Sequence, residues 1–209
     1  NSLREINRTE VSCGVELKLK AAFLRELTKM TVRDILDDPA NSARMMSLKN
    51  VINYSIDFIL QNSNAFHSLM VIQSHDFYTY THSVNVCTLC VGLGSSIGLP
   101  LYPDLYILGL GGMLHDLGKK NIDTLILNKP ESLNAEEYDT IRKHVGFGAD
   151  LLRGHTDIPE EAVRMVLEHH ERFNGSGYPK GLSGDNISMF GRIAQIVEVY
   201  DAMTTDFPY

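Results

Sequence analysis

Histidine and aspartate side chains interrupt five apolar segments of this 209-residue sequence. They are His82, His115–Asp116, His144, His169–His170 and Asp201. A buried imidazole or carboxylate is costly unless it is paired or bound to a metal. A single buried histidine is more often hydrogen-bonded to a backbone carbonyl. Five histidines and two aspartates on five predicted helices favour a shared metal site instead. Imidazole and carboxylate ligands suit Mn, Fe, Co, Ni or Zn.

Two stretches hold most of these residues. In GGMLHDLGKK, residues 111–120, an apolar helix gives way to His115–Asp116, and Gly118 can take the left-handed position after a helix end. In RMVLEHHERFNGSGYPKGL, residues 164–182, paired histidines precede a glycine-rich turn. Gly175 and Gly177 permit positive φ and close backbone approach, and Pro179 stiffens the turn. We therefore interpret this loop as one wall of a pocket rather than as a simple connection between two helices.

The elements that must position these residues are helices. Apolar spacing predicts a first helix through Leu17–Leu27 and a short second one, opened by Thr31–Asp34 and closed at Pro39. Later helices are predicted over about 42–62, 66–74, 80–97, 103–117, 134–153, 159–171 and 189–204. Because the alternation typical of strands is nearly absent, the sequence predicts an all-α fold.

Composition narrows the class of protein. A formal charge of −7 and a pI near 5.6 argue against a surface that binds a nucleic-acid polymer. The three cysteines predict no disulfide framework and favour a reducing compartment, so we expect a cytoplasmic protein. Cys87 and Cys90, three residues apart on an apolar helix, are interpreted as core residues. No apolar run has the length of a membrane span.

The chain is expected to divide near residue 45. Residues 1–44 are more charged and carry none of these candidate residues, so they are interpreted as a helical linker or the tail of an upstream module. Residues 45–209 form the expected functional domain.

The order of these residues resembles the HD superfamily of metal-dependent phosphohydrolases, and His169–Arg172 followed by Gly175–Leu182 resembles its HD-GYP subfamily. That subfamily hydrolyses the bacterial second messenger cyclic di-GMP. The resemblance, from Met45 to Tyr209, implies an HD-domain helical bundle with a Gly-Tyr-Pro loop beside the metal site. It also implies further C-terminal helices that this sequence lacks.

By this resemblance two divalent ions are expected, Fe or Mn, with Ni, Co or Zn as alternatives. His82, His115, Asp116 and Asp201 would hold one ion. Asp116, His144, His169 and His170 would hold the other, with Asp116 bridging the two. Lys119 matches the lysine that faces the substrate phosphate, and Arg192 would assist at longer range. The resemblance also implies that Gly177, Tyr178 and Pro179 line the substrate pocket.

Four positions depart from the family pattern. Tyr78 stands where some members carry a glutamate for a third metal, so two metals are expected. Asn174 and Glu198 stand where aspartate is more usual, and we expect them to alter only the bonding around the ligands. Phe207 replaces a common arginine that can contact substrate phosphate.

The sequence therefore predicts a cyclic di-GMP phosphodiesterase with a binuclear metal centre and linear pGpG as its first product, with GMP as the further product. Two alternatives stay open. One is a catalytically weak cyclic di-GMP receptor or partner-binding module, and the other is an HD phosphohydrolase acting on another nucleotide. Expected partners are an upstream sensor domain and diguanylate cyclase domains that contact the Gly-Tyr-Pro loop.

Overall fold

The computed structural model describes residues 2–61, 64–71, 78–99 and 102–204, with side chains from residue 15 onward except those of 71, 78 and 79. These residues form α-helices and two short 3₁₀ helices, with no β-strand among them, which confirms the predicted all-α fold. None of the described helices is long and apolar enough to cross a membrane. In chain order the elements are α1 (Ser2–Asp37), α2 (Ser42–Gln61), α3 (Ala65–Val71), α4 (Tyr78–Ser96), α5 (Tyr102–Leu114), η1 (Leu117–Asn121), α6 (Thr124–Leu127), α7 (Ala135–Arg142), α8 (His144–Arg153), α9 (Glu160–Glu168), η2 (Gly184–Asn186) and α10 (Met189–Thr204).

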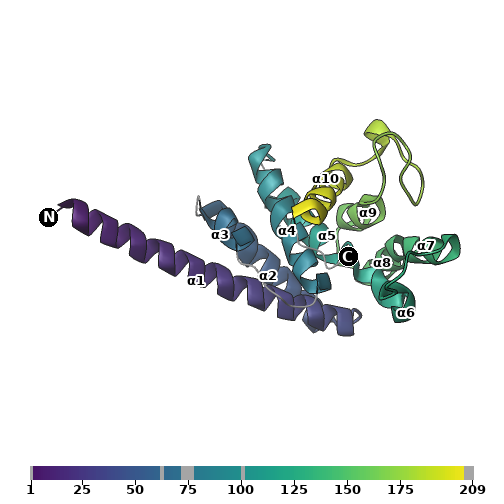
Figure 1. Ribbon diagram of the computed structural model, residues 1–209, viewed down its shortest axis with the longest axis horizontal. Helices are drawn as coiled ribbons and strands as arrows, with labels where there is room; N and C mark the ends of the chain where they lie inside the picture. The colour runs from purple at the N-terminus through teal and green to yellow at the C-terminus, as the bar shows by residue number, and fades with distance from the viewer. Residues whose placement is uncertain (1, 62–63, 72–77, 100–101, 205–209) are drawn as a thin grey trace.

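Helices α4 and α5 form the centre of the bundle, with α2, α9 and α10 packed around them (Figure 1). Helix α5 is buried almost throughout, and two of its glycines allow its neighbours to approach closely. A Cβ on Gly112 would lie 3.1 Å from Cα of Cys87, and one on Gly111 would lie 2.4 Å from the sulfur of Met165. This close packing brings the start of α4, the end of α5 and the end of α9 to one region.

The N-terminal segment differs from its prediction. A second helix opening at Thr31 was wrong, because α1 continues unbroken to Asp37 and the Thr31 hydroxyl donates to the carbonyl of Leu27. Helix α1 lies alongside α2 and α3 and contacts α4 (Figure 1). Val32 and Ile35 are buried in the main core. The division of the chain near residue 45 stays a prediction.

The remaining helices follow the predicted order with local differences. The segment predicted as one helix over 134–153 is divided at Lys143 into α7 and α8. The short α6 was not predicted, and α9 ends at Glu168, immediately before the paired histidines. His144 is the first residue of α8 and is fully buried.

Candidate metal centre

The side chains of the candidate site come from the ends of α4, α5, α8 and α9 and from the middle of α10. His115 and Asp116 lie between the end of α5 at Leu114 and the start of η1 at Leu117. Helix η1 packs against α8 so tightly that a Cβ on its Gly118 would lie 1.9 Å from the carbonyl oxygen of His144. Gly118 does not have the positive φ that the sequence suggested. It is required instead by this close approach, which sets Asp116 beside His144.

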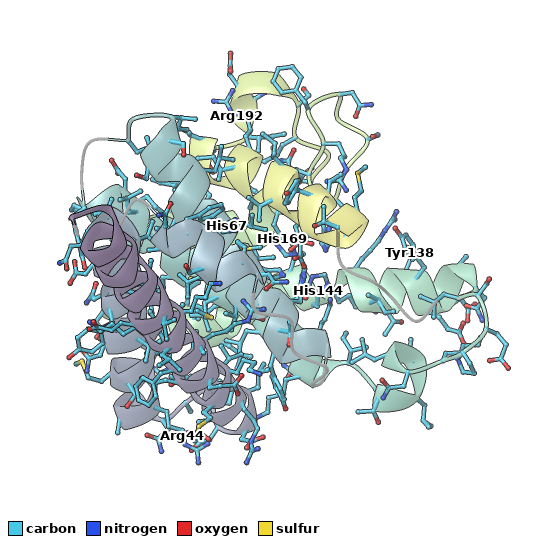
Figure 2. The ribbon with its side chains drawn as sticks, turned by 60° about the vertical axis from the view of Figure 1, so that its left-hand side comes forward. Arg44, His67, Tyr138, His144, His169 and Arg192 are labelled. Carbon is cyan, nitrogen blue, oxygen red and sulfur yellow. The ribbon has the colours of Figure 1, made fainter. Side chains whose placement is uncertain are left out.

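Four buried or half-buried residues form the first candidate ligand set, which we call the four-residue group. Their ligand atoms lie within 4.8 Å of one another. Nε2 of His144 lies 3.3 Å from Nε2 of His169 and 3.4 Å from Oδ1 of Asp116. Figure 2 shows His144 and His169 close together in the interior of the bundle. The members are Asp116, His144, His169 and His170.

A second set, the three-residue group, consists of His82, His115 and Glu198. Nε2 of His82 and Nε2 of His115 are 3.1 Å apart. Oε1 of Glu198 lies 2.8 Å from Nε2 of His115 and 3.3 Å from Nε2 of His82. Each set therefore directs its own imidazole nitrogens and carboxylate oxygen toward one point, where a metal ion could bind.

The other ring nitrogen fixes the tautomer in four of these histidines. Nδ1 of His115, His144 and His169 lies 2.7–2.8 Å from the carbonyl three residues earlier, to which it donates. Nδ1 of His82 donates to the carboxylate of Asp201 at 2.7 Å. Because Nδ1 carries the proton in each neutral ring, each Nε2 bears a lone pair.

Where the rings are neutral, these lone pairs face one another and face buried carboxylate oxygens, which is unfavourable unless a proton or a metal cation lies between them. Oδ1 of Asp116 and Oε1 of Glu198 are buried with no hydrogen-bond partner. Ionised carboxylate oxygens only accept hydrogen bonds, so a lone pair on Nε2 cannot satisfy them. Divalent cations suit this donor set of imidazoles and carboxylates. The residues of both groups therefore fit metal ions.

Asp116 faces both groups with different oxygens. Its Oδ1 is directed to His144 in the four-residue group, while its Oδ2 lies 3.3 Å from Nε2 of His115 and 3.8 Å from Nε2 of His82. Nζ of Lys119 lies 2.6 Å from the same Oδ2. One carboxylate can thus contact a cation in each group, as expected of a bridging ligand.

Asp201 lies elsewhere than the sequence suggested. Its carboxylate contacts Nδ1 of His82, on the opposite edge of the ring from the three-residue group, and accepts a hydrogen bond from Asn85 at 2.8 Å. Glu198, one helical turn earlier on α10, has the position beside Nε2 that we expected for Asp201. We had expected Glu198 to alter only the bonding around the ligands, but the structure places its carboxylate among the candidate ligand atoms. The signal that could have identified it was a carboxylate at the family's aspartate position.

The two groups differ in electrostatics. Burial opposes a charge on His115, but the charges of Asp116 and Glu198 outweigh it and raise the pKa of His115 to about 10. In the four-residue group, burial together with the nearby charge of His144 lowers the pKa of His170 to about 3. Burial likewise lowers the pKa of His169 and of His144. The four-residue group therefore holds neutral imidazoles at neutral pH, whereas the three-residue group attracts a positive charge.

Lys119 borders the centre with a side chain that is one-third exposed. Burial lowers its pKa, but the adjacent charge of Asp116 outweighs burial and raises it, so the ammonium stays protonated. Asp116 keeps its negative charge for the corresponding reason: burial raises its pKa, but Lys119 and His115 lower it well below its usual range.

The Gly-Tyr-Pro loop lies against the four-residue group. The ring of Tyr178 stacks on His170 with centroids 4.7 Å apart, and the Tyr178 amide donates to the His170 carbonyl. Gly175 has the predicted positive φ of 82°. Gly177 does not, but a Cβ there would lie 2.3 Å from the amide nitrogen of Arg172. The loop therefore needs both glycines, each for a different reason.

Two buried glutamates beside the paired histidines, which the sequence interpretation missed, bind backbone amides of the segment between α9 and α10. The carboxylate of Glu171 accepts from the amides of Lys180 and Leu182, each at 2.8 Å. Glu168 accepts from the amide of Ser188 at 2.7 Å and from Arg164. Acidic residues on both sides of the paired histidines were the available signal. Asn174, in contrast, caps a local turn by accepting from Ser176.

Arg192 does not lie at the site. It is in the first turn of α10, its guanidinium contacts Asp185 at 3.0 Å, and it lies well away from His144 and His169 in Figure 2. Six residues separate it from Glu198, which corresponds to roughly 9 Å along the helix. The side chain of Tyr78 and the whole of Phe207 lie outside the described residues.

Comparisons with known proteins identify the family of the chain. Residues 71–209 match the family model of the HD domain. The chain is 41% identical to a cyclic di-GMP phosphodiesterase of Pseudomonas aeruginosa, covering 72% of this chain and 36% of that protein. It is 31% identical to a 3'3'-cGAMP-specific phosphodiesterase of Vibrio cholerae, covering 91% of this chain and 36% of that protein. The chain thus spans about a third of the length of these relatives.

A solved structure from Bdellovibrio bacteriovorus, described as an HDG"Y"P protein, has a similar fold. Its TM-score is 0.80 at 24% identity, covering 90% of this chain and 61% of that one.

Proposed function

Because this chain belongs to the HD domain family, we propose that it hydrolyses cyclic di-GMP at a centre of two divalent metal ions. The observation that carries the proposal is Asp116, whose two oxygens face the Nε2 atoms of two separate groups of histidines. A relative named as a cyclic di-GMP phosphodiesterase supports this substrate, and one named for 3'3'-cGAMP supports the wider class of cyclic dinucleotides.

In this proposal the four-residue group holds one ion, and His82, His115 and Glu198 hold the other together with Asp116. Asp201 is not a ligand but orients His82 through Nδ1. Bound there, the two ions would activate a water molecule for attack on phosphorus and neutralise charge on the phosphoryl oxygens. Fe or Mn would suit the donor set, and Ni, Co or Zn are alternatives.

The residues of the chain itself prepare the site in three ways. The lowered pKa values of His169 and His170 keep both rings neutral, so that their lone pairs are free near neutral pH. Asp116 remains a carboxylate that can serve both groups. The ammonium of Lys119, partly exposed and held beside Asp116, would meet a non-bridging oxygen of the scissile phosphate and stabilise charge that develops there.

Tyr178 and its loop would form one wall of the substrate pocket. The ring is fixed by its stacking on His170, and the guanidinium of Arg142 lies 5.0 Å from the ring centroid. Burial raises the pKa of Tyr178, so its hydroxyl remains a neutral hydrogen-bond donor. Gly177 and Pro179 keep the backbone close to the site. The same loop is the surface through which we propose contact with diguanylate cyclase domains, and an upstream sensor would regulate the activity.

The test is turnover by anaerobically purified protein after each metal is restored. We expect hydrolysis of cyclic di-GMP to linear pGpG, with slower conversion to GMP, as followed by chromatography of a time course. The parallel assay with 3'3'-cGAMP decides between the two substrates. Asp116→Asn should abolish turnover and lower the bound metal. Specific binding of cyclic di-GMP without turnover by any metal-replete form would instead indicate a receptor.

A further inference from the structure

The histidines of the metal centre are oriented in two different ways. His115, His144 and His169 each donate Nδ1–H to a carbonyl of the preceding turn or helix. Their orientation therefore depends on local backbone. His82 instead depends on Asp201, which belongs to α10 and lies 119 residues away in the sequence.

Asp201 is itself held by a chain of buried side chains that reaches the N-terminal helix. Oδ1 of Asp201 accepts from Nδ2 of Asn85 on α4 at 2.8 Å. Oδ1 of Asn85 accepts from the guanidinium of Arg25 on α1 at 2.6 Å. The chain thus runs from Arg25 through Asn85 and Asp201 to His82, and all four side chains are buried.

The chemical groups at its two ends set the direction of every hydrogen bond in this chain. A guanidinium can only donate, so it must meet the amide oxygen of Asn85. The NH₂ group of Asn85 then faces Asp201, whose ionised carboxylate can only accept. Asp201 must in turn receive the proton of His82 on Nδ1, which leaves the lone pair on Nε2 toward the three-residue group. Arg25 therefore favours the tautomer of His82 that can bind a metal.

The placement of Arg25 is costly, because its side chain is only 2% exposed. Removing a guanidinium from water is strongly unfavourable unless its hydrogen bonds are satisfied. Besides Asn85, the guanidinium donates to the carbonyl of Leu69 at 3.3 Å. An apolar residue would have anchored α1 at lower cost, as Leu24 does by packing with Val51 and Leu69. Anchoring alone therefore does not account for a buried arginine at this position.

We propose that Arg25 is a positioning residue for the His82 metal site, so that docking of α1 and metal binding by the three-residue group are coupled. The inference rests on the proposed function only in that it requires this group to bind a metal. Coupling between two equilibria is reciprocal: whatever α1 docking adds to metal affinity, the metal adds to α1 docking. A displacement of α1 would then weaken one of the two metal sites.

The test is an Mn²⁺ titration of the full chain under anaerobic conditions, followed by the electron paramagnetic resonance of the free ion. The binding step that disappears in Glu198→Gln identifies the three-residue group. Arg25→Met keeps the length and apolar part of the side chain but removes its donors. We expect it to weaken that step about tenfold and leave the other unchanged, since removing a group that orients a ligand costs about 10–100-fold in affinity. Arg25→Lys, which keeps a charged donor, should recover part of the loss.

Leu24→Ala is the matched control. It removes apolar packing beside Arg25, in contact with Val51 and Leu69, but leaves Arg25 and its hydrogen bonds in place to hold α1 docked. It should lower the free energy of unfolding while leaving both Mn²⁺ affinities close to those of the parent. The reciprocal measurement is amide hydrogen exchange in α1, which Mn²⁺ should slow by a similar factor in the parent but not in Arg25→Met.

Parent affinity at both steps in Arg25→Met would overturn the inference, as would equal weakening by Leu24→Ala. A parent protein that took up no Mn²⁺, Fe²⁺ or Zn²⁺ would overturn the proposed function as well, so the two failures are distinguishable.

Discussion

Two carboxylates three residues apart on α10 provide a sharp test of how this metal centre is assembled. Glu198 lies beside Nε2 of His82 and His115, whereas Asp201 lies behind His82 at Nδ1. Glu198→Gln and Asp201→Asn make the same chemical change, a neutral amide for a carboxylate. If Glu198 is the ligand and Asp201 only orients a ligand, the two variants should differ greatly in metal affinity.

The expected difference follows from the distances. A unit positive charge at Nε2 of His115 would be 2.8 Å from Oε1 of Glu198. At an effective dielectric constant of about 20, this corresponds to about 6 kcal/mol, or roughly 10⁴-fold in affinity. Asp201→Asn keeps one acceptor but places an NH₂ group against either His82 or Asn85, both of which donate. Disturbing a group that orients a ligand costs about 10–100-fold.

The assay combines metal analysis with titration. At micromolar free Mn²⁺, Glu198→Gln should retain one ion and Asp201→Asn two, the second bound 10–100-fold more weakly than in the parent protein. The exposed Glu131, replaced by glutamine, is a control that should match the parent. Loss of an ion from Asp201→Asn together with parent affinity in Glu198→Gln would refute this reasoning and restore Asp201 as the ligand.

Three further predictions concern the surroundings of the centre. Lys119→Ala should keep both ions and lower kcat about 10²–10³-fold, because the lysine acts on substrate charge; the neighbouring Lys120→Ala, whose ammonium binds the carbonyl of Asp37, should not change kcat. Metal loss from Lys119→Ala would contradict that role. Glu171→Gln should cost about 1–3 kcal/mol of unfolding free energy in urea, because one of two loop amides loses its acceptor; an effect no larger than that of Glu131→Gln would show that the loop does not depend on Glu171. The metal-free protein should lose stability as the pH falls from about 6.5 to 4.5. In that window the unfolded chain takes up protons on His144, His169 and His170, whereas the folded chain resists protonation because the pKa values of these residues are lowered. His82 and His115 do not oppose this loss of stability, because their raised pKa values keep them protonated in the folded chain throughout the window. Urea titrations in a chelator check this; His170→Gln should flatten the profile, and a flat profile in the parent would contradict the assignment.

The sequence was informative wherever polar residues interrupt an apolar helix. His115–Asp116 and His169–His170 could be identified without knowledge of the fold, because ionisable side chains stand out against their apolar neighbours in the sequence. The all-α class could also be predicted, because the helical spacing of apolar residues can be recognised within a short window of sequence.

Features that depend on how helices pack could not be predicted in this way. Glu198 and Asp201 lie one turn apart on α10, and only the rotation of that helix against α4 decides which carboxylate faces Nε2. Gly118 is needed because of a carbonyl on α8, and Arg25 meets Asn85 across 60 residues of sequence. Thr31 has the residue type of a helix start, but packing of α1 on its neighbours continues the helix through it.

The shared carboxylate of Asp116 is the central claim, and anomalous diffraction from crystals of anaerobically prepared, Mn²⁺-loaded protein tests it most directly. The account predicts two anomalous peaks, one in the four-residue group and one in the three-residue group. Asp116 should contact both ions, at distances near those of first-row divalent metals to oxygen, about 2.0–2.2 Å. A single peak, or two peaks of which only one contacts Asp116, would contradict it.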